Sequence, residues 1–340
     1  MIDLRSDTIT LPSKEMLREM SKAELGDDVF AEDKTTNELQ EYIADMFGKE
    51  AALFVSSGTM GNQLGVKVNT NAGDEIILES QSHIFIYETA APSIISRVQL
   101  FPVESEKGMM PIEKVEQAIR PEVYYFPKTS MIAVENTHNR HSGTIITLDY
   151  IKKLSALAKK HKLKMHLDGA RLWNAIVATG IPAEKWAEYF DTVTVCFSKG
   201  LGAPVGSMLI ASKKDIEKAR KWRKIIGGGM RQTGVLASAA LFAVKNNFNR
   251  IAEDNANAKL FAEKIAVADE IDVNLDMVET NIVYFDLPTV AKFKKFINKC
   301  REKGLLLIPT GDRTARAVFH LHISAKDALN AADIVLNSVK

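Results

Sequence analysis

The sequence predicts an α/β protein, in which a mainly parallel sheet flanked by helices is followed by a smaller α+β domain. From residue 124 to residue 211, short apolar strands alternate with amphipathic helical segments, a pattern typical of parallel strands joined by helical crossovers. From about Asn246 this alternation gives way to helices and short strands in an order typical of an α+β domain. With 340 residues the chain is long enough for both. We therefore expect an extended arm over residues 1–13, a large domain over 14–245 and a small domain over 246–340.

Hydrophobic periodicity and chain-breaking residues place the individual elements. Residues 35–47 are predicted to be helical, because apolar side chains recur at helical spacing and Gly48 ends the segment. Residues 192–197 (TVTVCF) are predicted to form a buried strand, because β-branched and apolar residues follow one another without interruption. Further helices are expected over 14–21, 148–160, 173–179, 213–224, 234–245, 251–266 and 290–303, and further strands over 51–55, 75–79, 131–134, 163–167, 273–275, 282–285, 305–308 and 317–323.

The composition excludes several classes of protein. Hydrophobic residues make up 46% of the chain, charged residues 26%, and the net charge is +1, which argues against a nucleic-acid surface or a polybasic membrane patch. The two cysteines lie far apart and lack the spacing of metal ligands or of a disulfide framework. The first residues do not resemble a signal peptide, and no run of about 18 apolar residues occurs. We expect a cytoplasmic protein.

A lysine follows the buried strand over 192–197. Lys199 lies directly after it, at the start of a loop that holds Gly200, Gly202 and Gly206. A desolvated lysine amine loses basicity and becomes nucleophilic, as a Schiff base with a carbonyl compound requires. A lysine that simply extends to solvent from the end of a strand is the alternative interpretation.

A candidate anion site lies between the strand over 51–55 and the helix that follows it. The segment Ser57-Gly58-Thr59 places hydroxyl groups and free N–H groups at the start of that helix, which suits a phosphate. A Walker lysine and the GxGxxG fingerprint are both missing, so a nucleotide-binding loop is not indicated. An ordinary capped helix would have the same sequence pattern.

Two more polar residues follow apolar strands. Asp168 ends the strand over 163–167, and His83 lies shortly after the strand over 75–79. In an α/β sheet ligands bind at the carboxyl ends of the strands, so Asp168 and Lys199 can face one crevice. Asp168 could equally cap the next helix, and a single histidine at the end of a strand is more often structural.

An anion site, an aspartate and a lysine together are what pyridoxal 5′-phosphate (PLP) requires. The anion site holds the phosphate, the aspartate keeps the ring nitrogen protonated, and the lysine carries the aldehyde. An aspartate about 3 Å from the ring nitrogen would contribute roughly 5 kcal/mol before desolvation, at an effective dielectric constant of about 20. The sequence therefore predicts PLP as the cofactor.

Six segments of the chain then indicate a family: RSDT (5–8), SSGTMGNQ (56–63), ENTHN (135–139), HLDGARLWNA (166–175), CFSKGLGAPVGS (196–207) and GGGMRQTG (227–234). Together they resemble the threonine aldolases, PLP enzymes of the aspartate-aminotransferase fold type in the β-eliminating lyase superfamily. The resemblance covers essentially the whole chain. It implies a seven-stranded, mainly parallel sheet in the large domain, and cleavage of L-threonine or L-allo-threonine to glycine and acetaldehyde.

The resemblance also implies a role for each residue of the site. Lys199 would hold the PLP, Asp168 would face the ring nitrogen, and His83 would stack on the ring and act as the base or position a water that does so. Arg171 would lie near both the ring oxygen and the substrate carboxylate, and Arg231 would reach the phosphate in a neighbouring subunit. The full set of expected cofactor contacts is Ser57, Gly58, Thr59, His83, Asp168, Arg171, Lys199 and Arg231.

Ser6, Arg171 and Arg316 would bind the substrate carboxylate, with Arg313 as the alternative to Arg316. Tyr125 stands where many relatives have a histidine that is thought to contact the substrate hydroxyl. Tyrosine is a poor base near neutral pH, so the preference between threonine and allo-threonine is left open.

The partners expected from the resemblance are an amino-acid substrate and further copies of the chain, as a dimer of dimers. A PLP-dependent lyase or aldolase acting on phenylserine or serine, and a PLP-binding regulator without turnover, are the competing functions. We expect no metal, because His138 and His141, like His320 and His322, have no third ligand at a suitable spacing.

Overall fold

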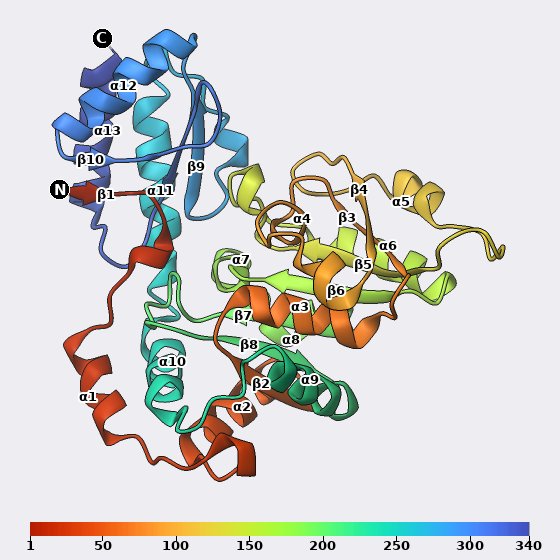
Figure 1. Ribbon diagram of the computed structural model, residues 1–340. Coiled ribbons are helices and arrows are strands. Elements are labelled where there is room, and N and C mark those ends of the chain that lie inside the picture. The colour runs from red at the N-terminus through yellow and green to blue at the C-terminus, as the bar shows by residue number, and fades with distance from the viewer. Residues whose placement is uncertain (340) are drawn as a thin grey trace.

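The computed structural model describes residues 1–339, and its large domain is built on a seven-stranded sheet (Figure 1). The strand order is β2-β8-β7-β6-β5-β3-β4, and only β8 runs against the other six. The expected mainly parallel, seven-stranded sheet is confirmed. Its strands are β2 (Ala51–Val55), β3 (Glu75–Glu79), β4 (Gln99–Val103), β5 (Thr129–Glu135), β6 (Lys164–Gly169), β7 (Thr192–Cys196) and β8 (Ser207–Ala211).

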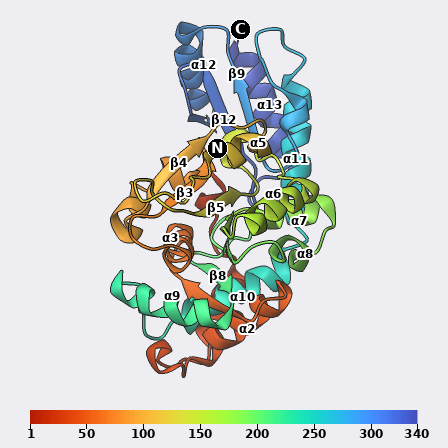
Figure 2. The same ribbon diagram turned by 90° about the vertical axis from the view of Figure 1, so that its right-hand side faces the viewer.

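Helices cover both faces of this sheet (Figures 1 and 2). Successive residues of a strand point to opposite faces, so in β5 Ile132 packs into the largest core cluster while Met131 packs into a separate cluster on the other face. This burial on both faces explains why the strands are almost continuously apolar. The helices of this domain are α1 (Lys14–Lys22), α2 (Lys34–Met46), α3 (Gly58–Asn69), α4 (His83–Ile86), α5 (Ile112–Ala118), α6 (Leu148–Lys160), α7 (Leu172–Thr179), α8 (Ala183–Ala187), α9 (Lys213–Ile225) and α10 (Gly234–Asn247).

The C-terminal part of the chain has a hydrophobic core of its own. Its three-stranded antiparallel sheet has the order β11-β12-β9, and helices pack against it. Figure 2 shows this α+β unit stacked at one end of the large domain. Its elements are α11 (Ile251–Ile265), β9 (Ile282–Asp286), α12 (Val290–Glu302), β10 (Leu305–Leu306), β11 (Ile308–Pro309), β12 (Thr314–Val318) and α13 (Ala325–Val339).

The N-terminal arm joins this C-terminal unit rather than lying apart from it. Strand β1 (Ile2–Asp3) pairs in parallel with β10, and Leu4 is fully buried in the C-terminal core. The arm then crosses to the large domain through the short 3₁₀ helix η1 (Asp7–Ile9). Residues at the start of the chain are thereby placed between the two cores.

Two strand predictions in the C-terminal part are wrong. Residues 273–275 do not form a strand, because Asn274 caps the 3₁₀ helix η5 (Leu275–Met277) through a bond from the Asp276 N–H to its side chain. The strand expected over 317–323 instead ends at Val318, and residues 319–323 form a turn. In the part of the chain that the structure describes, no helix is long and apolar enough to cross a membrane.

Candidate active site

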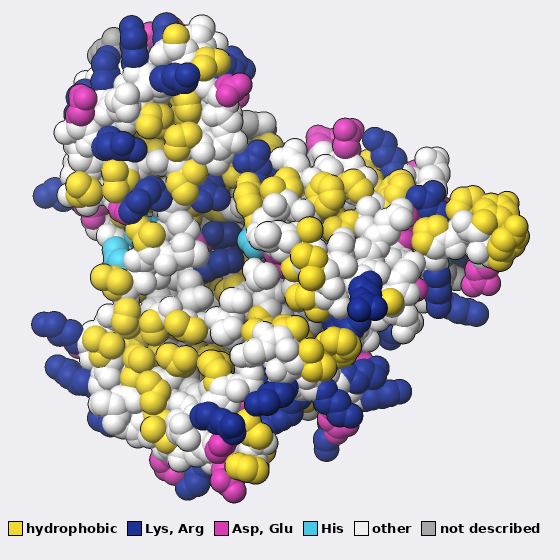
Figure 3. All heavy atoms as spheres, viewed as in Figure 1, with side chains coloured by type: hydrophobic (Ala, Val, Ile, Leu, Met, Phe, Trp, Pro, Cys, Tyr) yellow, Lys and Arg dark blue, Asp and Glu magenta, His cyan; other side chains and the backbone are white. Residues whose placement is uncertain are grey.

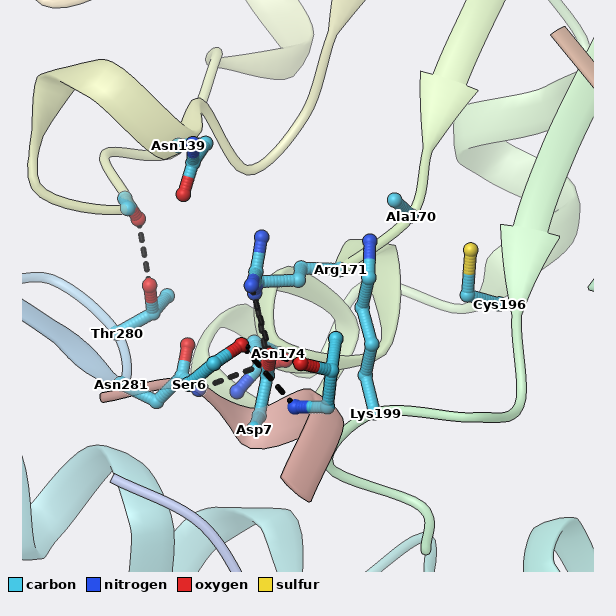
Figure 4. A network of polar contacts seen from close by, with 12 residues as sticks. Ser6, Asp7, Asn139, Ala170, Arg171, Asn174, Cys196, Lys199, Thr280 and Asn281 are labelled. Carbon is cyan, nitrogen blue, oxygen red and sulfur yellow. Dashed lines mark hydrogen bonds and ion pairs between the residues drawn. The ribbon is translucent and has the colours of Figure 1, made fainter. Parts of the chain in front are cut away.

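The carboxyl ends of the central strands hold most of the expected site residues. Asp168 lies near the end of β6, and Lys199 lies in the loop that follows the adjacent strand β7. The Lys199 carbonyl accepts bonds from the Thr10 hydroxyl at 3.0 Å and from the Gly202 N–H at 2.8 Å. Both contacts fix the backbone of a half-buried lysine, and Figure 4 shows its extended side chain together with those of Asp7 and Arg171.

Asp168 is buried and held by two donors. Its Oδ2 accepts a bond from the Asn62 amide at 2.7 Å, and its Oδ1 accepts one from the Ala170 N–H at 3.1 Å. Neither donor carries a charge, so the negative charge of the carboxylate remains available to a cationic group. This is the environment that a protonated ring nitrogen needs.

A chain of hydrogen bonds behind Asn62 sets its orientation. His166 is fully buried, and burial lowers its pKa to about 4, so the ring is neutral. Its Nδ1 lies 2.8 Å from the Thr192 hydroxyl, and its Nε2 lies 3.1 Å from Asn62 Oδ1. The Thr192 hydroxyl oxygen accepts a bond from the Asn69 amide, so its own proton can be donated to His166 Nδ1. The proton of the His166 ring then lies on Nε2. The amide oxygen of Asn62 therefore faces His166, and its NH₂ group faces Asp168.

A glycine makes room for this histidine. A Cβ atom on Gly65 would lie only 2.4 Å from His166 Cε1. Helix α3 can thus approach the sheet closely enough for Asn62, on the same helix, to reach Asp168.

The start of α3 has free N–H groups where the anion site is expected. Ser57 caps the helix by accepting a bond from the Met60 N–H at 3.2 Å, so the N–H groups of Gly58 and Thr59 remain for a ligand. A Cβ atom on Gly58 would lie 2.7 Å from the Cys196 sulfur, so this turn packs directly against the end of β7. A phosphate bound here would lie beside the end of β7, which the loop holding Lys199 follows. The residues present therefore fit PLP.

His83 opens the short helix α4, and its ring pairs with a buried carboxylate. His83 Nδ1 lies 2.9 Å from Glu88 Oε1, and the His83 N–H donates to Glu135 at 2.6 Å. Burial alone would lower the pKa of His83, but the bond to Glu88 and the charges of Asp168 and Glu135 outweigh it and raise that pKa. An Nδ1–H that donates to Glu88 leaves Nε2 as the free acceptor.

Glu88 also links His83 to the Asp168 side of the site. Its Oε1 accepts a bond from the Asn62 amide at 2.8 Å, and its Oε2 accepts one from the Gln63 amide at 2.6 Å. Asn62 thus donates to both acidic residues and sets the distance between them.

Arg171 forms a bidentate ion pair with the start of the chain. Its Nε and Nη2 both lie 2.7 Å from the Asp7 carboxylate oxygens, and both side chains are buried (Figure 4). Burial alone would raise the pKa of Asp7, but the guanidinium outweighs it and lowers that pKa to about 2. The pair joins the N-terminal arm to the turn between β6 and α7 and places Ser6 next to the site.

Arg316 approaches the same region from β12. Its Nη1 donates to the Asn139 side chain at 3.0 Å, and its Nη2 donates to the Arg5 carbonyl at 3.1 Å. Arg316 therefore lies beside Ser6, whereas the alternative, Arg313, bonds the Pro288 carbonyl and is exposed. The space-filling view shows a hollow between the two domains with arginine or lysine and histidine side chains along it (Figure 3).

Two expected site residues lie outside this group. Tyr125 is 67% exposed on the loop before β5, at the opposite end of that strand from the site. Arg231 is exposed and pairs with Asp27 at 3.1 Å. Neither residue reaches the site of its own chain, so a contact of either with cofactor or substrate stays a prediction that needs a second copy of the chain.

Sequence reasoning missed the residues that support the site. Asn62 and Gln63 end the segment SSGTMGNQ (56–63), but nothing in the sequence shows that their amides turn toward Asp168 and Glu88. Glu88 lies five residues after His83 and has no sequence signal of its own. The supporting residues that the structure adds are Asp7, Asn62, Gln63, Glu88, Glu135, Asn139 and His166.

Comparison with known proteins identifies the family. The beta-eliminating lyase family profile matches residues 3–288. The chain belongs to the beta-eliminating lyase family. The predicted superfamily and the prediction of a lyase are thereby confirmed.

Individual proteins are similar to the chain over nearly its whole length. A low-specificity L-threonine aldolase of Arabidopsis thaliana is 43% identical over 332 residues, which cover 96% of this chain and 93% of that protein. The alanine racemase TOXG of Cochliobolus carbonum is 38% identical over 315 residues, 90% of this chain and 80% of that protein. Among solved structures, a threonine aldolase of Leishmania major superposes with a TM-score of 0.85 at 19% identity, covering all of both chains. That structure supports the fold.

Proposed function

We propose that this protein cleaves L-threonine and L-allo-threonine to glycine and acetaldehyde, with PLP bound at Lys199. The observation that carries the proposal is the convergence of Lys199, Asp168 and the N-terminus of α3 at one edge of the sheet. The aldolase of Arabidopsis thaliana, at 43% identity, supports the reaction and the substrate. When bound, PLP supplies an acceptor for the electron pair that remains on the substrate α-carbon after the bond to the β-carbon breaks.

The protein's own residues would position the cofactor and set its charge. The N–H groups of Gly58 and Thr59 would donate to the phosphate, with the Ser57 hydroxyl beside them. Asp168 would accept a bond from the protonated ring nitrogen, and the Asn62–His166 chain would keep that carboxylate in place. A neutral His166 suits this role, because it supplies a donor without competing for the charge of Asp168.

Substrate orientation would come from the arginines. Arg171 uses its Nε and Nη2 on Asp7, which leaves Nη1 for the substrate carboxylate. Arg316 and Ser6 would bind the same carboxylate from the other side. A carboxylate held in this way fixes which bond of the α-carbon stands perpendicular to the ring, and therefore which bond breaks.

His83 would remove the proton of the substrate β-hydroxyl. Glu88 accepts from Nδ1, which directs the lone pair of Nε2 outward as the base. The raised pKa of His83 makes the neutral imidazole a stronger base, although it narrows the pH range in which the ring is neutral.

We also propose a cytoplasmic homo-oligomer, a dimer of dimers, in which Arg231 and Tyr125 act in the sites of neighbouring copies. Both side chains are exposed, as are the large apolar residues Leu11, Leu17 and Phe30 of the N-terminal part. Both cysteines are free and buried, which is consistent with a reducing compartment. Light scattering during size-exclusion chromatography would test the assembly, and a monomer would contradict it.

The reaction is tested with purified protein and its Lys199→Ala variant. The visible absorbance of lysine-bound PLP should be present in the wild type and absent from the variant. L-Threonine and L-allo-threonine should each release glycine and acetaldehyde in equal amounts. Because one relative is named an alanine racemase, L-alanine is assayed for D-alanine, and phenylserine and serine are assayed for their products. PLP binding with products only from another substrate would overturn the proposed reaction but keep the cofactor.

A further inference from the structure

Beside the active site, three metal-ligating side chains converge that the proposed reaction does not use. They are Glu79 at the end of β3, His138 after β5, and His141 at the end of the 3₁₀ helix η4 (Asn139–His141). One ligand atom from each lies within 4.8 Å of the others. The sequence offers only the two histidines, because Glu79 is 59 residues before His138 and is brought to it by the pairing of β3 with β5.

We propose that Glu79, His138 and His141 form a binding site for Zn²⁺ or a similar divalent transition-metal ion. The inference is independent of the proposed reaction. Two imidazoles and a carboxylate are a ligand set that zinc uses, with a water as the fourth ligand.

The distances suit such an ion. His141 Nε2 lies 3.4 Å from Glu79 Oε1, and His138 Nε2 lies 2.9 Å from Glu79 Oε2, so each histidine faces a different oxygen of the carboxylate. Metal–ligand bonds of about 2.05 Å in a tetrahedral arrangement place two ligand atoms roughly 3.4 Å apart. The first distance already has this value, and the second needs a shift of about half an ångström, which a side-chain rotation supplies.

The hydrogen bonding of His138 favours a bound metal ion over a simple ion pair with Glu79. His138 is fully buried, and neither of its ring nitrogens makes an aligned hydrogen bond, although Nε2 is close to Glu79. An unsatisfied buried polar group is costly. A metal ion on Nε2 would remove that cost for one of the two nitrogens.

Charge and access also favour a cation. Glu135 is close enough to act on the charge of His138, so two carboxylates surround the site. The side chain of His141 is 15% exposed, so it is reached by solvent, and the Ser105 hydroxyl lies 3.2 Å from its Nε2 as a further polar group beside the site. A bound ion would tie β3 to the η4 turn, whose Asn139 accepts the bond from Arg316.

The experiment titrates Zn²⁺ into the PLP-loaded protein after treatment with a chelator, with a competing dye as the readout, and compares two variants. His141→Gln removes a partly exposed ligand, so the variant should fold. His161→Gln is the matched control, because His161 lies 3.4 Å from Glu116 on the surface, and no third metal ligand joins them among residues 1–339. We expect one Zn²⁺ per chain in the wild type, at least tenfold weaker binding in His141→Gln, and unchanged binding in His161→Gln.

A second measurement does not depend on any variant. Zn²⁺ should raise the Tm of the wild-type protein, since a ligand that binds only the folded state stabilises it, and Co²⁺ in its place should give the visible absorbance of a tetrahedral site. No stoichiometric Zn²⁺ binding and no rise in Tm would overturn the proposal and leave a histidine–glutamate ion pair. An equal loss of affinity in both variants would also overturn it, because the ion would then be bound at the surface.

Discussion

Glu88 is the residue at which the proposed role of His83 is most sharply tested. The Glu88→Gln substitution removes the negative charge beside His83 and keeps the shape of the side chain. Two unit charges 2.9 Å apart attract each other by roughly 6 kcal/mol at an effective dielectric constant of about 20. About a third of the His83 side chain is exposed, and a glutamine oxygen can still accept from Nδ1. Because solvent screens the charge, we expect the substitution to destabilise the protonated form of His83 by only about 1.5 kcal/mol.

The variant should fold because its neighbour can adapt. In the wild type, Gln63 donates to Glu88 Oε2, while the Gln63 side-chain oxygen is buried without a partner. If the Gln63 amide turns over, its oxygen accepts from the NH₂ group that the substitution introduces. The oxygen of the substituted side chain can then stay directed toward His83 and Asn62.

The assay is the pH dependence of kcat for L-threonine. His83 must be neutral to act as a base, and Glu88 raises its pKa, so protonation switches the enzyme off as the pH falls through that pKa. Without the charge of Glu88, the fall of kcat on the acid side (the acid limb of the profile) should move to lower pH. The highest kcat should decrease by about tenfold, because His83 is then a weaker base. The control is Glu116→Gln, which removes an exposed glutamate beside His161 and should change neither quantity. An acid limb that stays in place, or moves to higher pH, would refute the role of Glu88 and of His83 as the base.

Three further predictions concern the supports of the site. Asp7→Asn leaves the buried Arg171 without its counter-charge and should lower the free energy of unfolding by about 3 kcal/mol. The control Asp149→Asn changes an exposed residue and should lower it by less than about 0.5 kcal/mol. Equal losses in denaturant unfolding would contradict a stabilising role of the Asp7–Arg171 ion pair. Because the folded pKa of Asp7 is depressed to about 2, the stabilisation by this pair is complete above the unfolded value of about 4 and is lost as the pH falls toward 2, which the acid dependence of the Tm would show. Gly65→Ala pushes against His166 and should lower stability by about 1–3 kcal/mol and weaken PLP binding; a variant that holds PLP as tightly as the wild type would argue against the Asn62–His166 support. Arg316→Lys should raise the KM for threonine about tenfold with less effect on kcat, and the control Arg313→Lys should leave both unchanged. The reverse result would assign binding of the substrate carboxylate to Arg313.

The sequence by itself determined the fold class and the chemistry. The spacing of apolar residues predicts the alternation of strands and helices, because each strand between two helical layers must be apolar on both faces. Lys199, Asp168 and the Ser57–Thr59 turn could be predicted as site residues because each follows an apolar strand, and parallel strands end at one edge of a sheet. Local sequence also set the boundaries of helices with clear caps, such as α6, which begins after Thr147 and runs over Leu148–Lys160.

Only the tertiary structure decided how these residues are held. The donors to Asp168 and Glu88, the pairing of Asp7 with Arg171 across 164 positions and the meeting of Glu79 with His138 depend on which elements lie side by side. Hydrogen bonds of this kind join residues far apart in the chain and leave no periodic pattern in it. The wrong strand over 273–275 has a related cause, because Asn274 formed a local side-chain bond that competes with strand pairing. Residue types thus specified what the site can do, and strand order specified which side chains support it.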